Sequence, residues 1–143
     1  MASRVGEIVL FVDDDCIAAP DWLEKMLEPF NDPQIDGAKG AYLSKQKELI
    51  ARFVQVEYEE KYVKLSNHRY IDFIDTYSAG FRRSAFLEAG GYDVSFPTAS
   101  VEDQEFSFRL ANAGRKMVFV PEAKVFHTHV KTINEYISKK RKI

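Results

Sequence analysis

Residues 7–15 read EIVLFVDDD, and this stretch decides the fold class of the chain. Five consecutive apolar residues, Ile8 to Val12, include several β-branched side chains and are followed directly by three aspartates. Short apolar runs of this kind are typical of strands buried on both faces in a parallel sheet, where ligands bind beyond the carboxyl ends of the strands. We therefore expect a buried strand whose end places carboxylates at a ligand site.

The rest of the sequence alternates helical and strand patterns, which indicates an α/β protein. Apolar residues at helical spacing predict helices over residues 20–30, 45–67, 84–89, 102–113 and 133–138. Strands are predicted over residues 41–43, 71–77, 117–120 and 124–127, with turns at residues 37–40 and 121–122. Nothing in the sequence resembles a linker, so residues 1–143 are expected to form a single domain.

Composition excludes several classes of protein. The 143 residues include 20 basic and 22 acidic ones, and the net charge of -2 provides no positive field to hold nucleic acid. Cys16 is the single cysteine, so no internal disulfide can form. The apolar runs are far shorter than a transmembrane helix needs, and no signal peptide opens the chain. We expect a cytoplasmic protein without a transmembrane segment or a nucleic-acid partner.

The aspartates after the first strand are candidate metal ligands. Residues two apart in a strand face the same side, so Asp13 and Asp15 are expected to converge while Asp14 points away. Two converging carboxylates suit a hard divalent cation such as Mg²⁺ or Mn²⁺. A solvated strand end is the alternative, since acids are common at turns. A second alternative is a haloacid-dehalogenase-like phosphatase, in which an aspartate of an Asp-x-Asp pair is the nucleophile.

A second acidic site lies at the start of a predicted helix. Glu102 and Asp103 stand where carboxylates stabilise the helix N-terminus, and where one of them could also serve as a general base. His127 and His129 follow the last predicted strand and share a face if that strand continues. A lone histidine is commonly a core or surface residue, whereas a histidine beside the aspartates would complete a metal site and favour Mn²⁺ over Mg²⁺.

Several motifs occur in an order that resembles the family 2 glycosyltransferases of the GT-A fold. They extend from Gly6 to Tyr136 and comprise residues 6–15, Pro20-Asp21-Trp22-Leu23, Phe81-Arg82-Arg83-Ser84-Ala85-Phe86, Gly90-Gly91-Tyr92-Asp93, Glu102-Asp103-Gln104-Glu105 with Arg109, and His127. Each motif alone is common, but the ordered set is specific. The resemblance implies a partial GT-A fold, with a mixed sheet flanked by helices, that matches the later part of the family's catalytic domain.

The resemblance also implies an activity and a set of site residues. It predicts metal-dependent transfer of a sugar, with inversion, from a nucleotide-diphospho-sugar to a saccharide or lipid-linked acceptor. Asp13 and Asp15 match the residues that contact the donor and its Mn²⁺ or Mg²⁺, His127 (or its neighbour His129) matches the third metal ligand, and Asp103 matches the general base. Glu102 is expected to raise the pKa of Asp103. The stretch Ser78, Ala79, Gly80 and Arg82 resembles a segment near the donor.

The sequence departs from the family pattern in two ways. Nothing in it corresponds to the upstream strand-helix-strand segment that holds the nucleotide, so we expect the isolated chain to bind donor weakly, to be catalytically silent and to self-associate through an exposed sheet edge. The Gln-x-x-Arg-Trp motif of processive synthases is missing, which favours a single-addition enzyme. A non-catalytic cation-binding or interaction module remains the alternative. The basic residues 139–142 either contact the inner face of a membrane or are simply solvated.

Overall fold

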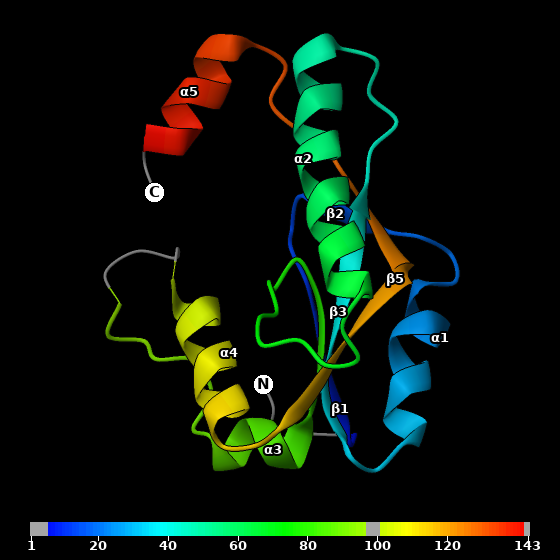
Figure 1. The fold of residues 1–143 in the computed structure, drawn as a ribbon, viewed down its shortest axis with the longest axis vertical. Helices are drawn as coiled ribbons and strands as arrows, with labels where there is room; N and C mark the ends of the chain where they lie inside the picture. Colours follow the sequence, from blue (N-terminus) through cyan, green and yellow to red (C-terminus); the bar gives the residue numbers. More distant parts are fainter. Residues whose placement is uncertain (1–5, 97–100, 142–143) are drawn as a thin grey trace.

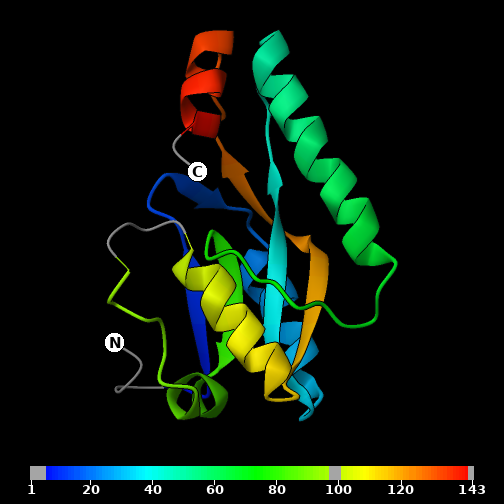
Figure 2. The ribbon, with the colours of Figure 1, turned by 60° about the vertical axis from the view of Figure 1, so that its left-hand side comes forward.

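A computed structural model describes residues 6–96 and 101–141, and their strands form one mixed sheet with helices on both faces (Figures 1 and 2). Across the sheet the order is β1-β4-β3-β5-β2, where β3 and β5 are parallel and the other pairs are antiparallel. The bounds are β1 Ile8–Val12, β2 Cys16–Ala18, β3 Ile35–Leu43, β4 Ser78–Arg82 and β5 Lys116–His127. The predicted α/β class with a mixed sheet is confirmed.

Three of the strands point to the same edge of the sheet. β1 and β3 both run antiparallel to β4, and β5 runs parallel to β3, so β1, β3 and β5 share one direction. Their carboxyl ends are followed by the aspartates at residues 13–15, by Ser44, and by the two histidines. The sheet therefore gathers polar residues from distant parts of the sequence at one edge, as expected for a ligand site.

The strand β1 is not buried between parallel neighbours, and that prediction is wrong. In the described part of the chain β1 pairs only with β4, and its residues are half-buried. Its side chains are apolar on both faces because each face meets a different core cluster: Leu10 packs with Trp22 and Met26, and Phe11 packs with Phe81. An edge strand covered on both sides by helices thus has the same continuous apolar pattern as a central strand.

The segment around Gly40 is a strand, although its glycines suggested a turn. Residues 37–40 lie within β3, where all of them are buried. A Cβ atom at position 40 would overlap Ser78 Oγ and the carbonyl oxygen of Ala123. Glycine is therefore present here because two neighbouring strands approach closely, and not because the backbone turns.

Two further predicted elements differ from the structure. Residues 71–77 form a loop with a single bridge, in which the N–H of Ile71 donates to Met117 O at 2.8 Å. Their buried side chains, Ile71, Ile74 and Tyr77, are three residues apart and do not alternate. Ile74 lies under α4, where Ser107 Oγ accepts from the Ile74 N–H at 3.0 Å. The last two predicted strands are one strand, β5, which continues through Pro121 with an irregular register against β3.

The helices agree with the predicted ones to within a few residues at each end. They are α1 Trp22–Leu27 with a following 3₁₀ helix Glu28–Asn31, α2 Leu49–Ser66, α3 Arg83–Glu88, α4 Glu102–Asn112 and α5 Ile133–Arg141. Helix α1 packs on one face of the sheet, and α4 lies on the opposite face (Figure 2). Of the helices in the described ranges, none combines the length and apolar composition that crossing a bilayer requires. Lys142 of the basic segment lies outside the described residues.

The close approach at Gly40 gives the first testable prediction. We expect Gly40→Ala to lower the free energy of unfolding by about 1–3 kcal/mol, because the added methyl group meets backbone that cannot move aside. Gly37→Ala is the matched control in the same strand: its Cβ would meet the mobile ends of Ile74 and Met117 at 2.9 and 3.0 Å, so its cost should be smaller. Urea denaturation followed by circular dichroism measures the free energy of unfolding of both variants. Equal losses would contradict the explanation that position 40 is restricted by neighbouring backbone.

Candidate functional site

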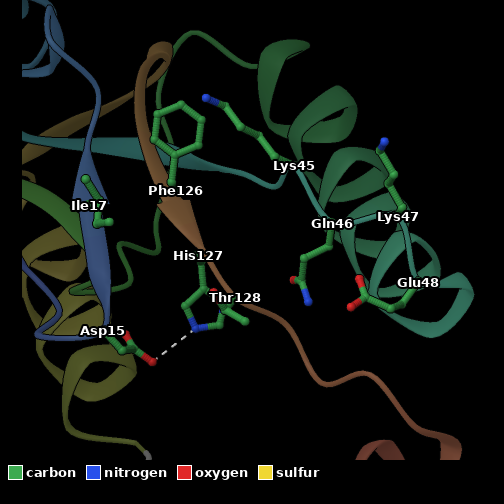
Figure 3. A pocket seen from close by; sticks show the side chains of 9 residues that line it. All are labelled: Asp15, Ile17, Lys45, Gln46, Lys47, Glu48, Phe126, His127 and Thr128. Atoms are coloured by element: carbon green, nitrogen blue, oxygen red, sulfur yellow. Dashed lines mark hydrogen bonds and ion pairs between the residues drawn. The ribbon is translucent and has the colours of Figure 1, made fainter.

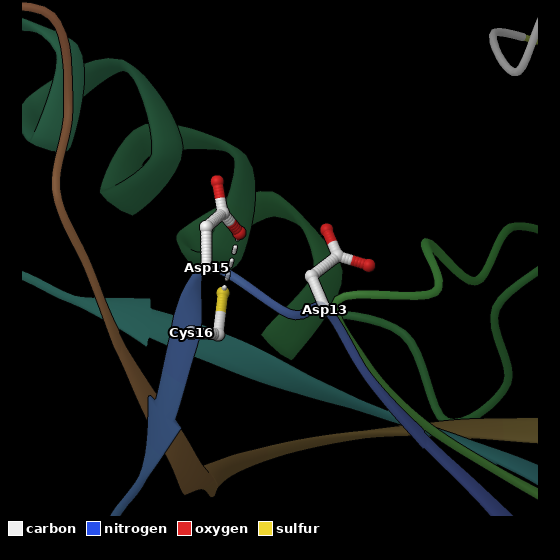
Figure 4. A group of neighbouring side chains, drawn as sticks. All are labelled: Asp13, Asp15 and Cys16. Atoms are coloured by element: carbon white, nitrogen blue, oxygen red, sulfur yellow. Dashed lines mark hydrogen bonds between the residues drawn. The ribbon is translucent and has the colours of Figure 1, made fainter.

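The aspartates that follow β1 form a turn that leads into β2. The N–H of Cys16 donates to Asp13 O at 3.1 Å, which closes this turn. Oxygen atoms of Asp13 and Asp15 and the Cys16 sulfur lie within 4.8 Å of one another. Both carboxylates point to the same side of the chain (Figure 4), and Asp14 is not a member of the group. The expected convergence of Asp13 and Asp15 is present, although a turn produces it and not strand alternation.

Cys16 has the properties of a packing residue and not of a metal ligand. Its thiol donates to Asp15 Oδ1 at 3.6 Å, and the side chain packs against the first core cluster. Burial, followed by the negative charge of Asp15, raises the pKa of the thiol to about 12. Because a thiol binds metal as the thiolate, this side chain stays protonated and leaves the carboxylates as the ligands.

His127 lies beside Asp15, the last aspartate of this turn. Its Nε2 atom is 3.1 Å from Asp15 Oδ2, and the two residues line an open cavity of about 1010 Å³ (Figure 3). Lys45 and Lys47 line the same cavity. His129 lies behind His127 and is buried, with its Nδ1 atom 3.1 Å from His127 Nδ1. His127 is therefore the histidine that contacts the aspartates.

A second cavity brings Asp13 and Asp103 together. It has a volume of about 460 Å³, and both residues line it although they are far apart in the sequence. Asp103 belongs to the first turn of α4, where Val101 occupies the N-cap position and no side chain caps the helix. Glu102 does not line this cavity, and its Oε2 atom accepts a hydrogen bond from the Val101 N–H at 3.1 Å.

The surroundings of Asp103 raise its pKa. Burial is the largest cause and the negative charge of Asp75 is the second. The N–H of Gln104, which donates to Asp103 Oδ1 at 2.8 Å, acts in the opposite direction. Glu102 also raises the pKa of Asp103, as the sequence predicted, but it contributes less than burial and Asp75.

A buried ion pair that no sequence motif indicates lines the same cavity. The Lys39 ammonium on β3 contacts the Asp75 carboxylate, and these side chains are 3% and 26% exposed. Burial lowers the pKa of Lys39, while Asp75 acts to raise it. Lys39 is a single lysine among the small residues 37–41. This pattern indicates a buried charge, but only if the segment is known to be a buried strand. Asp75 had no signal, because its loop was predicted to be a strand.

The predicted donor segment lies largely in the core. Ala79 and Gly80 are buried in β4, and Ser78 Oγ accepts from the Trp22 indole N–H at 2.8 Å. Arg82 is at the opposite end of β4, where its guanidinium donates to the carbonyl oxygens of Phe30, Asp32 and Ile35. None of these four residues lines either of the two cavities described above. Their contact with a donor stays a prediction.

The fold is that of the GT-A-type glycosyltransferases. A mannosyltransferase from Pyrobaculum calidifontis, solved with GDP-Man and Mn²⁺, superposes with a TM-score of 0.68 and 18% identity, covering 96% of this chain and 36% of that one. GalNAc-T7, solved with UDP, GalNAc and Mn²⁺, gives a TM-score of 0.62 and 15% identity over 89% of this chain and 28% of its own. These likenesses confirm the predicted fold.

The sequence comparisons identify the family. The model described as "Glycosyltransferase like family 2" matches residues 2–142, and the chain belongs to this family. A pre-mycofactocin glycosyltransferase of Mycobacterium tuberculosis is 24% identical over 98% of this chain and 31% of its own length. A glucosyl-dolichyl phosphate glucuronosyltransferase of Haloferax volcanii is 27% identical over 85% of this chain and 43% of its own. The chain therefore spans less than half the length of these relatives.

The ion pair in the second cavity gives a prediction about stability. Asp75→Asn should lower the free energy of unfolding by roughly 3 kcal/mol at neutral pH, because it leaves the buried Lys39 ammonium without its carboxylate. The loss should shrink as the pH rises toward the ordinary lysine pKa, since the unfolded chain then binds more protons than the folded one and folding becomes relatively more favourable. Denaturant unfolding at several pH values measures this dependence.

Two variants serve as controls for the ion pair. Lys39→Met combined with Asp75→Asn should recover most of the lost stability, because no unpaired charge remains. Lys61→Met, which changes an exposed lysine lining the same cavity, should stay within about 0.5 kcal/mol of wild type. A double variant no more stable than Asp75→Asn alone would show that the pair is not what stabilises this region.

Proposed function

We propose that this chain provides the metal-binding and acceptor-activating residues of an inverting glycosyltransferase. The sugar would come from a nucleotide-diphospho-sugar, and the acceptor would be a hydroxyl of a saccharide or a lipid-linked molecule. The observation that supports this most strongly is the turn at residues 13–15, which contributes Asp13 to the cavity of Asp103 and Asp15 to the cavity of His127. One short turn thus connects a candidate base with a candidate cation site.

Asp103 is the proposed general base. Its carboxylate lines an accessible cavity, and burial raises its pKa, which makes a carboxylate a stronger base. In the proposed step, the acceptor oxygen forms a bond to the anomeric carbon, the bond from that carbon to the diphosphate breaks, and the acceptor proton moves to Asp103. Glu102 is proposed to assist by adding negative charge near Asp103.

Asp13, Asp15 and His127 are the proposed ligands of Mn²⁺ or Mg²⁺. Two carboxylates and an imidazole suit either cation, and the imidazole favours Mn²⁺. Burial and the charges of the neighbouring aspartates raise the pKa of Asp13, so a cation would relieve repulsion within the turn. Both structural neighbours were solved with Mn²⁺. A bound divalent cation would neutralise the negative charge that develops on the departing diphosphate.

The sequence is also compatible with two other functions. Membership of a glycosyltransferase family argues against a haloacid-dehalogenase-like phosphatase, in which Asp13 would be the nucleophile. A non-catalytic cation-binding module would need the turn but not Asp103. The accessible and partly buried Asp103 therefore favours the enzyme, and the Asp103 variant described below separates the two.

Further parts of the proposal concern the isolated chain. We propose that the 143 residues alone bind donor weakly and do not turn it over, since the relatives are more than twice as long. Calorimetric titration with UDP-, GDP- and dTDP-sugars in the presence of Mn²⁺ tests this, and tight binding would refute it. Self-association through the β1 edge and a cytoplasmic location, with the inner face of a membrane as an option, stay predictions.

Asp103→Asn should abolish turnover without abolishing donor binding. The amide cannot accept the acceptor proton, so we expect a loss of about 10²–10⁴-fold in turnover with donor affinity changed little. Turnover is measured in a full-length family 2 enzyme that contains this segment. Asp72→Asn, an exposed aspartate in the nearby loop, is the control and should retain activity. Full activity of the Asp103 variant would refute the assignment of the base.

Asp15→Asn should weaken metal binding, and Asp14→Asn should not. Asp15 belongs to the converging group and contacts His127, whereas its neighbour Asp14 belongs to neither. We expect the affinity for Mn²⁺, measured by calorimetry on the 143-residue chain, to fall at least about tenfold in the first variant. Equal losses in the two variants would mean that the acids attract cations only by their total charge.

A further inference from the structure

A chain of hydrogen-bonding side chains continues inward from His127. His127 Nδ1 is 3.1 Å from His129 Nδ1, and His129 Nε2 is 2.8 Å from Gln55 Oε1 on α2. His129 and Gln55 are 3% and 9% exposed. His127 itself presents its other nitrogen, Nε2, to Asp15. The hydrogen-bond partners of these side chains determine which ring nitrogens of His127 and His129 carry protons.

The amide of Gln55, at the inner end of this series of hydrogen bonds, has only one possible orientation. Gln55 Nε2 donates to Tyr42 O at 3.1 Å and to Glu59 Oε1 at 3.2 Å. Both of these partners are acceptors, so the amide cannot be reversed without placing three oxygens against one another. Gln55 therefore presents its oxygen to His129, and His129 must hold a proton on Nε2 to donate to it.

The direction of Gln55 determines the proton position on both histidines. His129 is 3% exposed, and none of the ion pairs among the described residues gives it a carboxylate partner, so a charged ring would be buried without a counter-charge. The ring is therefore neutral and has a single ring proton, on Nε2. Its Nδ1 is then an acceptor, and His127 must donate to it from its own Nδ1. A neutral His127 with its proton on Nδ1 has a free lone pair on Nε2, the atom that faces Asp15 Oδ2.

The surroundings also fix the orientation of the two rings. Gln46 holds the backbone of His129 from both sides: its Oε1 accepts from the His129 N–H at 2.6 Å and its Nε2 donates to His129 O at 3.0 Å. Tyr42 stacks on His127, and Tyr58 stacks on His129. Neither ring can rotate freely, so the hydrogen-bonded chain keeps its geometry.

We propose that Gln55 and His129 are positioning residues that keep the proton of His127 on Nδ1, so that Nε2 is free to bind a divalent cation beside Asp15. This inference rests on the proposed function, which assigns His127 and Asp15 to the cation. An unprotonated nitrogen and a carboxylate oxygen repel each other at 3.1 Å unless a cation or a proton lies between them. A hydrogen-bonded partner that fixes the tautomer of a histidine ligand is a recurring feature of metal sites.

The proton position on His127 is measured directly in the wild-type chain by ¹⁵N NMR of its histidines. Spectra are recorded at about pH 8.5, well above the ordinary histidine pKa, without metal and with Mg²⁺. We expect a proton on Nδ1 of His127 under both conditions and none on Nε2 when Mg²⁺ is present. An unprotonated Nδ1 in the wild-type chain would overturn the inference.

Variants test whether the inner residues cause this arrangement. Gln55→Leu removes the acceptor for His129, and His129→Phe keeps an aromatic ring but removes the acceptor for His127. In both variants we expect the His127 proton to shift toward Nε2 and the Mn²⁺ affinity, measured by calorimetry, to fall about tenfold. Glu60→Gln, at an exposed position on the same helix, is the control and should change neither readout.

The outcomes separate this inference from the proposed function. If either variant folds and keeps both the wild-type proton position and the wild-type Mn²⁺ affinity, the positioning role is wrong. If neither folds, the wild-type spectrum alone decides. If the wild-type chain binds no Mn²⁺ but holds its proton on Nδ1 of His127, the proposed metal site is wrong while the hydrogen-bonded chain stands.

Discussion

The shared direction of β1, β3 and β5 is the constraint on which the site depends. Because β4 lies between β1 and β3 and runs antiparallel to both, β1 and β3 end at the same edge of the sheet. The parallel pairing of β3 with β5 adds a third carboxyl end there. A reversal of β1 would move the aspartates to the opposite edge and separate Asp15 from His127. The sheet topology, more than any local sequence, determines which polar groups meet.

The polar groups that meet at this edge are predominantly acidic, and Lys39 balances part of their charge. Asp75 contributes to the raised pKa values of both Asp13 and Asp103, although other causes are larger in each case. Lys39 compensates part of this charge from within β3, where it is almost completely buried and paired with Asp75. The aspartates at residues 13–15 have no comparable lysine contact among the described ion pairs. A divalent cation would supply positive charge beside these aspartates, where the described ion pairs place the His127 imidazole and no lysine.

Local sequence patterns predicted the helices and strands whose residues are determined by local signals. They did not predict the segments whose residues are determined by contacts with parts of the chain that are distant in sequence. The run Ile8 to Val12 and the helical spacing in α2 are local signals, and both elements exist as predicted. The pattern around Gly40 was misinterpreted because its glycine is required by the close approach of Ala123 and Ser78, which are distant in sequence. Residues 71–77 are a related case: their buried side chains, Ile71, Ile74 and Tyr77, are three residues apart, and Ile74 is buried by α4, which is distant in sequence.

The same distinction applies to the site. Asp13, Asp15, Asp103 and His127 could be proposed because the ordered motifs of a known family include them. The side chains that surround them, such as Lys39 and Gln55, belong to no motif and are recognised only through contacts that span the sheet.

The aspartate turn, residues 13–15, contributes to two cavities. In the proposed reaction these cavities would separate the departing diphosphate from the acceptor. The cavity of Asp15 and His127 is lined by Lys45 and Lys47, which in the proposed function would contact the negatively charged leaving group, and also by Glu48. The cavity of Asp13 and Asp103 is lined by aromatic residues, including Tyr58 and Phe73, which suit the apolar faces of a sugar or of a lipid-linked acceptor. Since both aspartates belong to one short turn, a displacement of this turn would alter the proposed leaving-group side and the proposed acceptor side together. The contact of Asp15 with His127, and of His127 with the residues behind it, therefore bears on both sides of the proposed reaction.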